Sequence, residues 1–328
     1  MLVYEAVQFA KIVLVCTSIG DFARAIVRAM LRSIETRVSG TSAPAAAWLN
    51  GMLGVLIFSA SLPATRIAVL EFNPLFLSFA RAAAAGILAL AILLLARQSR
   101  PTRADLPGLA RVAMGVVLGF PLLSALALRD ITSAHALLFI ALLPLSTALF
   151  AVLLAQERPT PVFWLFASIG AALVAAYALK QDRALGSLRG DGLMLASVVA
   201  AGIGYAEGGR LSRSLGGWQV ISWALVFSLP VMLPLAIWRA PVTWAGISMG
   251  AVASLAYVSV FSMLVGFVFW YRGLAHGGIA LVGQLQLLQP FLGMGLAALL
   301  LHEPVGASLI ATSVAVVLCV AGAKRFAS

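Results

Sequence analysis

The sequence predicts an all-α, polytopic membrane protein whose ten transmembrane helices form two inverted five-helix repeats. Three observations lead to this prediction. Of the 328 residues, 62% are hydrophobic and only 10% are charged, whereas a soluble domain is about half apolar and about 25% charged. Ten apolar runs are long enough to cross a bilayer. A shift of 146 residues brings Pro and Glu residues of the two halves into register.

The ten apolar runs are separated by charged residues, Pro and Gly. A helix needs about 20 apolar residues, rising about 1.5 Å each, to cross about 30 Å of hydrocarbon. The predicted spans are residues 46–67, 75–96, 107–128, 131–153, 161–179, 191–209, 218–238, 248–270, 278–301 and 305–323. A transmembrane β-barrel is excluded, because its strands are short and alternate in hydrophobicity. The short linkers leave no room for a soluble domain.

The distribution of Lys and Arg predicts that both termini lie in the cytoplasm. With the first span starting inside, the cytoplasmic connections carry ten basic residues and the N-terminal tail carries five, against five on the opposite side. Cytoplasmic loops of membrane proteins carry such an excess. The net charge of +11 is therefore an orientation signal, and we expect no nucleic-acid partner.

Residues 1–45 differ in character from the spans and are interpreted as a cytoplasmic or interfacial extension. Apolar residues recur every four positions on one face, and arginines recur every four on another: Phe22, Ile26, Met30 and Ile34, against Arg24, Arg28 and Arg32. This pattern is typical of a basic amphipathic helix on an anionic membrane surface. A disordered extension and a start-site artefact are the alternatives.

The internal repeat rests on two residue types that are rare in this chain. The 146-residue shift aligns Pro144 with Pro290 and Glu157 with Glu303. The repeats are predicted at 46–180 and 190–325, with five spans each, and an odd number of crossings makes the second copy enter the membrane from the opposite side. Inverted repeats are typical of secondary transporters, which bind their substrate between the halves and open to one side at a time.

Two segments resemble a known family. Residues 59–81, with NPLFLSFARA, and residues 132–160, ending in LLAQERPT, are similar to the signatures of the drug/metabolite transporter superfamily, EamA type. Pro290 and Glu303 form the second copy of the latter. The resemblance covers about residues 46–325. It implies a ten-helix carrier of the bacterial inner membrane, usually an exporter of amino acids or related metabolites, without ATP hydrolysis.

Gln284, Gln286 and Gln289 are the strongest candidates for substrate binding. They lie near the middle of the ninth predicted span, where polar side chains are costly and mark candidate sites. An amide donates to a carboxylate and accepts from an ammonium, which suits a zwitterionic or polar neutral solute. Hydrogen bonding between helices is the alternative role. Tyr205, Tyr257 and Trp223 are predicted to wall an apolar side of the same site.

Four further residues are candidates for gating or coupling. Arg81 is interpreted as structural or gating, through a pair with Glu71, or as a partner for a substrate carboxylate. His135 is a candidate for proton coupling, because histidine is the side chain type that changes charge near neutral pH, with a hydrogen bond to a neighbouring helix as the alternative. Pro144 and Pro290 each remove a helical hydrogen bond in mid-span, which predicts a kink or a hinge.

Three other polar or aromatic groups receive structural interpretations. Glu207 and Arg210 are three residues apart and are predicted to form a local ion pair. Arg66 is assigned to the membrane interface. Trp270 and Tyr271, at the end of the eighth span, are predicted to belong to the interfacial aromatic belt.

Enzyme motifs are absent from the sequence. No Walker A sequence occurs, and none of the three Lys residues follows a Gly-rich loop, so we expect no ATP hydrolysis. Three widely spaced His residues, together with Cys16 and Cys319 at opposite ends of the chain, make no metal site or disulfide framework. We therefore expect no cofactor, no metal and no enzymatic activity. A membrane-embedded transferase is the alternative of a different class.

These observations together predict a secondary transporter that exports a small polar metabolite, an amino acid or a derivative, by alternating access. An importer of a vitamin-like or nucleoside-like solute is the alternative on the same fold. The expected partners are the small-molecule substrate and membrane lipid, with a proton as a candidate coupling ion. A monomer and a homodimer are both compatible with the sequence.

Overall fold

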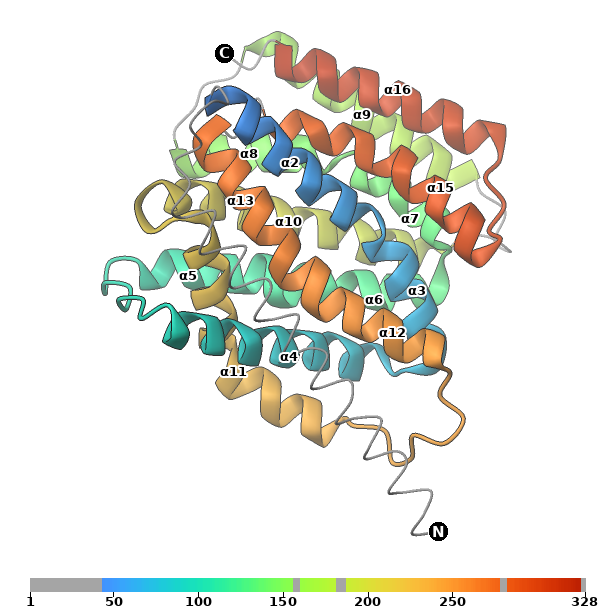
Figure 1. Ribbon diagram of the computed structural model, residues 1–328. Coiled ribbons are helices and arrows are strands. Elements are labelled where there is room, and N and C mark those ends of the chain that lie inside the picture. Colours follow the sequence, from blue (N-terminus) through green and yellow to red (C-terminus); the bar gives the residue numbers. More distant parts are fainter. Residues whose placement is uncertain (1–42, 156–159, 181–186, 278–281, 326–328) are drawn as a thin grey trace. The chain divides into compact units, whose positions relative to one another are not determined.

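Every regular element in the described part of the chain is a helix (Figure 1). The structure, a computed structural model, describes residues 43–155, 160–180, 187–277 and 282–325. The predicted amphipathic helix of the N-terminal extension lies outside these residues, and so does Glu157.

Ten helical spans follow one another along the chain and match the predicted spans in order. The first half comprises α2 (Ala43–Ser59) with α3 (Ser61–Glu71), α4 (Pro74–Leu95), α5 (Leu106–Val112) with the π-helix η1 (Ala113–Gly119) and α6 (Phe120–Asp130), α7 (Ser133–Ile140) with α8 (Leu143–Ala155), and α9 (Pro161–Lys180). The second half comprises α10 (Leu188–Leu215), α11 (Gly217–Trp238), α12 (Met249–Tyr257) with the π-helix η2 (Val258–Val265) and α13 (Gly266–Gly277), the 3-10 helix η3 (Gly283–Leu288) with α15 (Gln289–Leu301), and α16 (Ala307–Arg325). Within the described residues, seven helices are long and apolar enough to cross a membrane, and shorter apolar helices cover Leu285–Leu301 and Ala307–Cys319. The predicted fold class is confirmed.

Proline explains where four of the spans are interrupted. Its ring clashes with the carbonyl group four residues earlier and removes a helical hydrogen bond. α2 ends four residues before Pro63, and α7 ends four residues before Pro144. The residue four positions before Pro121 lies within η1, and the residue four positions before Pro290 lies within η3. Because α11 continues through two prolines of its own, proline permits an interruption but does not dictate one.

The two π-helices occupy equivalent places in the two halves. The 146-residue shift carries residues 113–119 of η1 onto 259–265, which lie within η2. Each π-helix joins the two α-helices of the third span of its half. Since π-helices are rare, their agreement supports the internal repeat independently of the Pro and Glu spacing.

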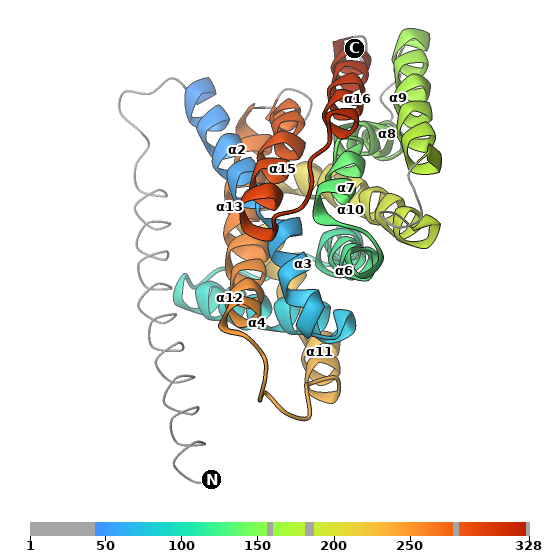
Figure 2. The same cartoon turned by 90° about the vertical axis from the view of Figure 1, so that its right-hand side faces the viewer.

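The packing of the helices follows the same repeat. α4 packs against α11 and α9 packs against α16, so that the second and fifth spans lie beside their own equivalents. Figures 1 and 2 both show α9 and α16 side by side. α13 packs on α2 as α6 packs on α10, which pairs the third span of each half with the first span of the other. With five spans in each half, the two halves run through the membrane in opposite orientations.

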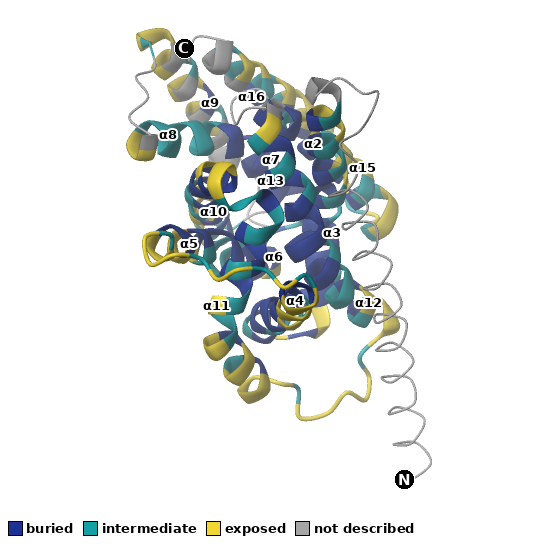
Figure 3. Cartoon of the chain, turned by 60° about the vertical axis from the view of Figure 1, so that its left-hand side comes forward, coloured by how far each residue is buried: buried dark blue, intermediate teal, exposed yellow. Residues whose placement is uncertain are grey.

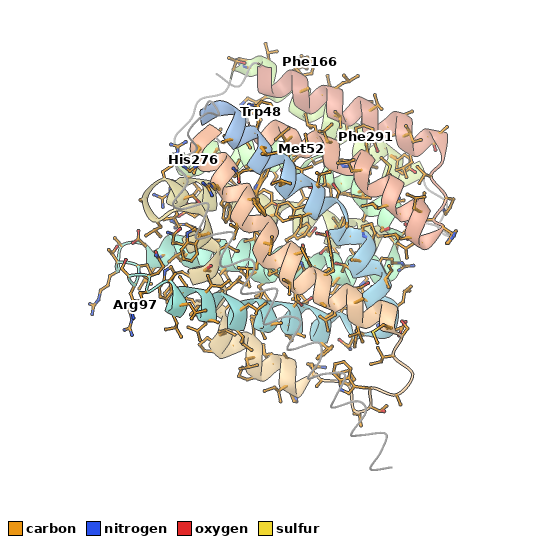
Figure 4. The ribbon with its side chains drawn as sticks, viewed as in Figure 1. Trp48, Met52, Arg97, Phe166, His276 and Phe291 are labelled. Carbon is orange, nitrogen blue, oxygen red and sulfur yellow. The ribbon has the colours of Figure 1, made fainter. Side chains whose placement is uncertain are left out.

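The outward faces of the helices are apolar. Figure 3 shows buried residues gathered along the centre of the helices and exposed residues on their outer faces and at their ends. Leu94, Ile237 and Leu299 are 68%, 69% and 75% exposed, as expected for side chains that face lipid. The charged side chain of Arg97 instead extends from the turn after α4 (Figure 4).

The predicted interfacial position of Trp270 and Tyr271 is wrong. Their side chains are 1% and 0% exposed, because α13 packs closely on α2 and α10. A Cβ atom at Gly54 would contact the backbone of Trp270, and the Tyr271 hydroxyl donates a hydrogen bond to the carbonyl oxygen of Gly204 at 3.0 Å. Small residues allow this close approach between membrane helices, and nothing in the local sequence distinguishes such an aromatic residue from one at the interface.

The contact between η1 and α10 predicts a sharp cost for one added methyl group. A Cβ atom at Gly115 would lie 2.6 Å from the carbonyl oxygen of Ala200 and 2.7 Å from the backbone nitrogen of Gly204. We expect Gly115→Ala to lower the unfolding free energy by roughly 1–3 kcal/mol, because backbone atoms cannot rotate away. Thermal unfolding of the detergent-purified protein measures this. Gly192→Ala is the control, since a Cβ atom there meets no atom within 4 Å; equal melting temperatures for the two variants would contradict the prediction.

Candidate functional site

A small cavity lies where the two halves meet. Its volume is about 20 Å³, which is enough for about one water molecule. Both halves contribute to its lining: Phe58, Ser61, Arg81, Val116, Phe120, Pro121, Leu143, Ala201, Tyr205, Ser262, Met263, Phe267 and Gln289.

The helix interruptions converge on this cavity. Phe58 and Ser61 flank the break between α2 and α3, and Leu143 follows the break between α7 and α8. Val116 and Ser262 belong to the two π-helices, while the first residue of α15, another lining residue, follows η3. Irregular backbone at membrane depth is tolerated where it lines a cavity, and transporters place their binding sites there. The cavity is therefore the candidate substrate site.

Equivalent positions of the two halves face the cavity with different side chains. Three pairs of lining residues lie 146 positions apart: Val116 and Ser262, Pro121 and Phe267, Leu143 and Gln289. In two of the pairs the first half supplies an apolar side chain and the second half a polar one. The backbone frame of the site is thus repeated, while its chemistry is not.

Arg81 provides the positive charge of the site. Its side chain is 3% exposed, and its Nη2 donates a hydrogen bond to Ser262 Oγ at 3.2 Å. Ser262 Oγ in turn shares a hydrogen bond of 2.7 Å with Ser61 Oγ. Within the described residues, Arg81 Nε has no hydrogen-bond partner. The predicted alternative of a pair with Glu71 is wrong, because the Glu71 carboxylate accepts hydrogen bonds from the backbone N–H and the hydroxyl of Ser248, both at 2.6 Å.

Two of the three predicted glutamines are buried at or beside the cavity. Gln289 lines it and donates from Nε2 to the carbonyl oxygen of Phe58 at 3.4 Å, while its Oε1 has no partner in the described chain. Gln286 lies one turn earlier and is 1% exposed. The Nε2 of Gln286 is unpartnered among the described residues. The side chain of Gln284 lies outside the described part of the structure.

The structure places Tyr257 and Trp223 away from the cavity lining. The Tyr257 hydroxyl donates to the carbonyl oxygen of Ile57 at 2.6 Å, and its ring stacks on Phe261. Trp223 stacks on Phe227 with ring centroids 5.8 Å apart. Of the three aromatic residues predicted to wall the site, the fold brings only Tyr205 to the cavity.

His135 forms a buried contact between the two halves. Its Nε2 lies 2.7 Å from Oδ1 of Asp191, in the first turn of α10. Both side chains are buried, and His135 Nδ1 has no hydrogen-bond partner within the described residues. The predicted gating prolines, Pro144 and Pro290, each lie in the first turn of the helix that follows an interruption.

Glu303 joins the halves at the end where α7 begins. It accepts hydrogen bonds from the backbone N–H groups of Ser133 and Ala134 at 3.0 and 2.8 Å and from the Ser133 hydroxyl at 2.7 Å. A carboxylate at this position satisfies free N–H groups and the helix dipole. Arg66 Nε lies 3.9 Å from the same carboxylate, and Arg66 Nη1 donates to the carbonyl oxygen of Leu128.

Glu207 joins the halves toward the opposite end. Its carboxylate accepts hydrogen bonds from Arg210 Nε and Nη2 at 3.1 and 2.7 Å, which confirms the predicted local pair. It also accepts one from Arg111 Nη2, on α5 of the first half, at 2.9 Å. Contacts between the halves are therefore present at both ends, through Glu303 and through Glu207.

Sequence reasoning missed the hydroxyl groups of the site. Ser61 and Ser262 connect the two halves beside Arg81, but a serine within an apolar span usually bonds to its own helix, as Ser59 and Ser78 do here. The repeat identified Glu303, but its role as an acceptor for the first N–H groups of α7 could not be predicted without the packing that brings the two together.

Comparisons with known proteins agree with this architecture. Residues 45–178 and 188–323 each match the model of the family described as "EamA-like transporter family". The chain is 62% identical over 280 residues to the "Uncharacterized transporter YdeK" of Bacillus subtilis (strain 168), an alignment that covers 85% of this chain and 97% of that protein. A solved structure titled "Crystal structure of protein" shares the fold at 20% identity with a TM-score of 0.61, covering 86% of this chain and 98% of that one.

The contacts of Glu303 predict a stability difference between two carboxylates that cap helices. Glu303→Gln keeps one oxygen acceptor but replaces the carboxylate, whose negative charge strengthens the hydrogen bonds from the start of α7. We expect the unfolding free energy to fall by roughly 1–3 kcal/mol. Glu71→Gln makes the same change at the start of α12, where Glu71 is exposed, and we expect a smaller loss. Thermal unfolding in detergent compares the two variants, and a greater loss for Glu71→Gln would refute this account of Glu303.

Proposed function

This chain belongs to the EamA-like transporter family, and from that premise we propose that it exports a small polar metabolite, an amino acid or a derivative, by alternating access. Membership makes the protein a multi-pass membrane transporter and not an enzyme. The membrane-embedded transferase is thereby set aside. The identity of the solute and the direction of its movement belong to the proposal.

The cavity between the two halves is the observation that supports this function. It lies among five helix interruptions, and Arg81, Ser262, Gln289 and Tyr205 bring polar groups to it. Polar groups inside a bilayer are retained where they bind a solute or define a pathway. The repeats proposed at 46–180 and 190–325 supply a mechanism, because two inverted halves that rock against each other expose the same cavity to alternate sides.

Gating is assigned to the contacts that close the two approaches. Opening toward one side breaks the contacts of Glu303 and of His135 with the other half, while opening toward the other side breaks the contact of Glu207 with Arg111. Pro144 and Pro290 allow the spans to bend at their interruptions. The His135–Asp191 contact, broken and formed in each cycle, is the proposed place for a proton to couple to transport.

The proposed orientation places both termini in the cytoplasm of a bacterial cell, with the protein in the inner membrane as a monomer or a homodimer. Figure 4 shows Arg97 and His276 at the same end of the helices as Trp48, near the start of the first span. The connections with the excess of basic residues lie at this end, and loops with such an excess stay on the cytoplasmic side.

Counterflow in proteoliposomes tests the function. We expect the purified protein to exchange at least one labelled solute from a panel of amino acids, their derivatives, vitamins and nucleosides, and a pH gradient to alter the rate if protons are coupled. Exchange of a vitamin or nucleoside with inward accumulation in cells would favour the importer instead. Failure of every solute would reject the carrier.

Gln289 provides a test of the site. We expect Gln289→Leu to abolish counterflow while the melting temperature changes little, because the cavity loses an amide that is hydrogen-bonded only weakly to Phe58. Gln219→Leu is the matched control, since Gln219 lies outside the cavity lining and bonds to Gln98. Transport by Gln289→Leu at the rate of the control would move the site elsewhere.

Single cysteines test the orientation. In a chain whose Cys16 and Cys319 are replaced by Ala, we expect a membrane-impermeant maleimide to label Thr243→Cys in intact cells. Ser99→Cys, between α4 and α5, should react only after permeabilisation, because its loop carries the arginines assigned to the cytoplasm. The reverse labelling pattern would invert the topology.

A further inference from the structure

We propose that Arg81 is a binding site for the carboxylate of the transported solute, and that the cargo is an organic monoanion with a small apolar body, which narrows the proposed metabolite to an anionic derivative without a free ammonium. This inference rests on the proposed function, because it names the class of solute that the same cavity takes. It is carried by the burial of Arg81, by the partners that its charge lacks, and by the chemistry of the remaining wall.

The charge of Arg81 is left without a counter-ion. Three ionic side chains other than His135 are buried in the described part of the chain: Arg81, Asp191 and Glu207. Asp191 contacts His135, and Glu207 binds two arginines. Arg81 has no carboxylate within 4.0 Å among the described residues, and Ser262 is its one hydrogen-bond partner there. A guanidinium stays charged at every physiological pH, and an unpaired charge in the bilayer is costly, so this arrangement favours a partner that arrives with the solute.

The buried side-chain groups without partners at the cavity and next to its lining residues are mainly donors, and Gln289 Oε1 is the acceptor among them. Arg81 Nε and Gln286 Nε2 are buried without partners in the described structure, and so is Trp270 Nε1, whose ring packs against the rings of Phe58 and Tyr205. Gln289 Nε2 makes only a long bond of 3.4 Å. Carboxylate oxygens accept from such donors, and arginine binds carboxylates in a bidentate manner. A surplus of buried N–H groups beside a cation is the complement of an oxyanion.

The rest of the wall offers no negative charge to a cation. No Asp or Glu is among the lining residues of the cavity, and most of the others are apolar, including Val116, Phe120, Leu143 and Met263. An amine would leave Arg81 unpaired and add a like charge. The ammonium of a zwitterion would find only neutral oxygens, such as those of Gln289 and Tyr205. A monocarboxylate with an apolar body matches both the charge of Arg81 and the apolar lining residues of the cavity.

The geometry also indicates when the anion binds. The cavity has room for about one water molecule, so the solute enters only after the halves separate. Arg81 lies on α4 and its partner Ser262 on η2, and the repeat equivalent of Arg81 is Phe227. One cation therefore serves the whole cavity. In the closed state the Ser262 hydroxyl accepts the hydrogen bond from Arg81 Nη2. We expect the incoming carboxylate to replace this hydroxyl as the acceptor.

Ligand-induced stabilisation of the detergent-purified full chain tests the proposal. The probes are straight-chain and phenyl-substituted monocarboxylates of two to nine carbons, each compared with its primary amide and its amine. We expect at least one carboxylate to raise the melting temperature and to bind about 10-fold or more tightly than its amide and amine. Equal stabilisation by an amide or amine, or no stabilisation by any carboxylate, would overturn the anion site.

Arg81 variants locate the effect. We expect Arg81→Gln to lose the preference for the carboxylate over the amide, and Arg81→Lys to retain part of it, because Lys keeps the charge but not the bidentate geometry. Arg189→Gln, on the exposed start of α10, is the matched control and should bind like the unmodified chain. A carboxylate preference that survives in Arg81→Gln would place the anion elsewhere. Should Arg81→Gln not fold, Arg81→Lys decides the location, since a carboxylate preference equal to that of the unmodified chain would place the anion elsewhere.

Parallel counterflow separates this proposal from the function on which it rests. If the protein moves only amines or uncharged solutes, the carrier stands and the anion site falls. If carboxylates bind through Arg81 but no solute exchanges, the site stands and the carrier falls. Exchange of a carboxylate that is lost in Arg81→Gln and kept in Arg189→Gln supports both.

Discussion

An unpaired backbone amide or carbonyl in hydrocarbon is costly, and the rest of this structure depends on that constraint. Helices satisfy it along most of every span, so the few places where the helix breaks must be covered by protein. Here the breaks before Pro63 and Pro144, the two π-helices and the 3-10 helix η3 all border one cavity. These segments of irregular backbone therefore lie around a cavity inside the protein, where the bilayer does not contact them.

The two halves share a backbone frame and differ in what they place on it. Val116 and Leu143 of the first half correspond to Ser262 and Gln289 of the second, and all four line the cavity. Inverted repeats with such a repeated frame are typical of secondary transporters, and the unequal side chains make the polar lining of the cavity asymmetric.

Buried charges in this protein fall into two kinds. Glu207 and Asp191 have charged or titratable partners on other elements, and together with Glu303 they hold the halves against each other. Breaking such a contact leaves a buried charge uncompensated, so each of them is costly to lose. Arg81 differs because its partner within the described chain is a neutral hydroxyl, and the proposed anion site is based on this difference.

The sequence by itself determined the number of spans, their order, the repeat and the local Glu207–Arg210 pair. These features depend on hydropathy along the chain, on the missing N–H of proline and on residues one turn apart, all of which are local. The tertiary structure alone decided that Trp270 and Tyr271 are buried, that Tyr257 and Trp223 lie away from the cavity, and that Glu71 bonds to Ser248 instead of Arg81. The physical reason is that lipid and the protein interior are equally apolar. The hydropathy of a segment therefore predicts that a residue lies in the membrane. Which side chains it contacts there depends on the packing of helices that are distant in the sequence.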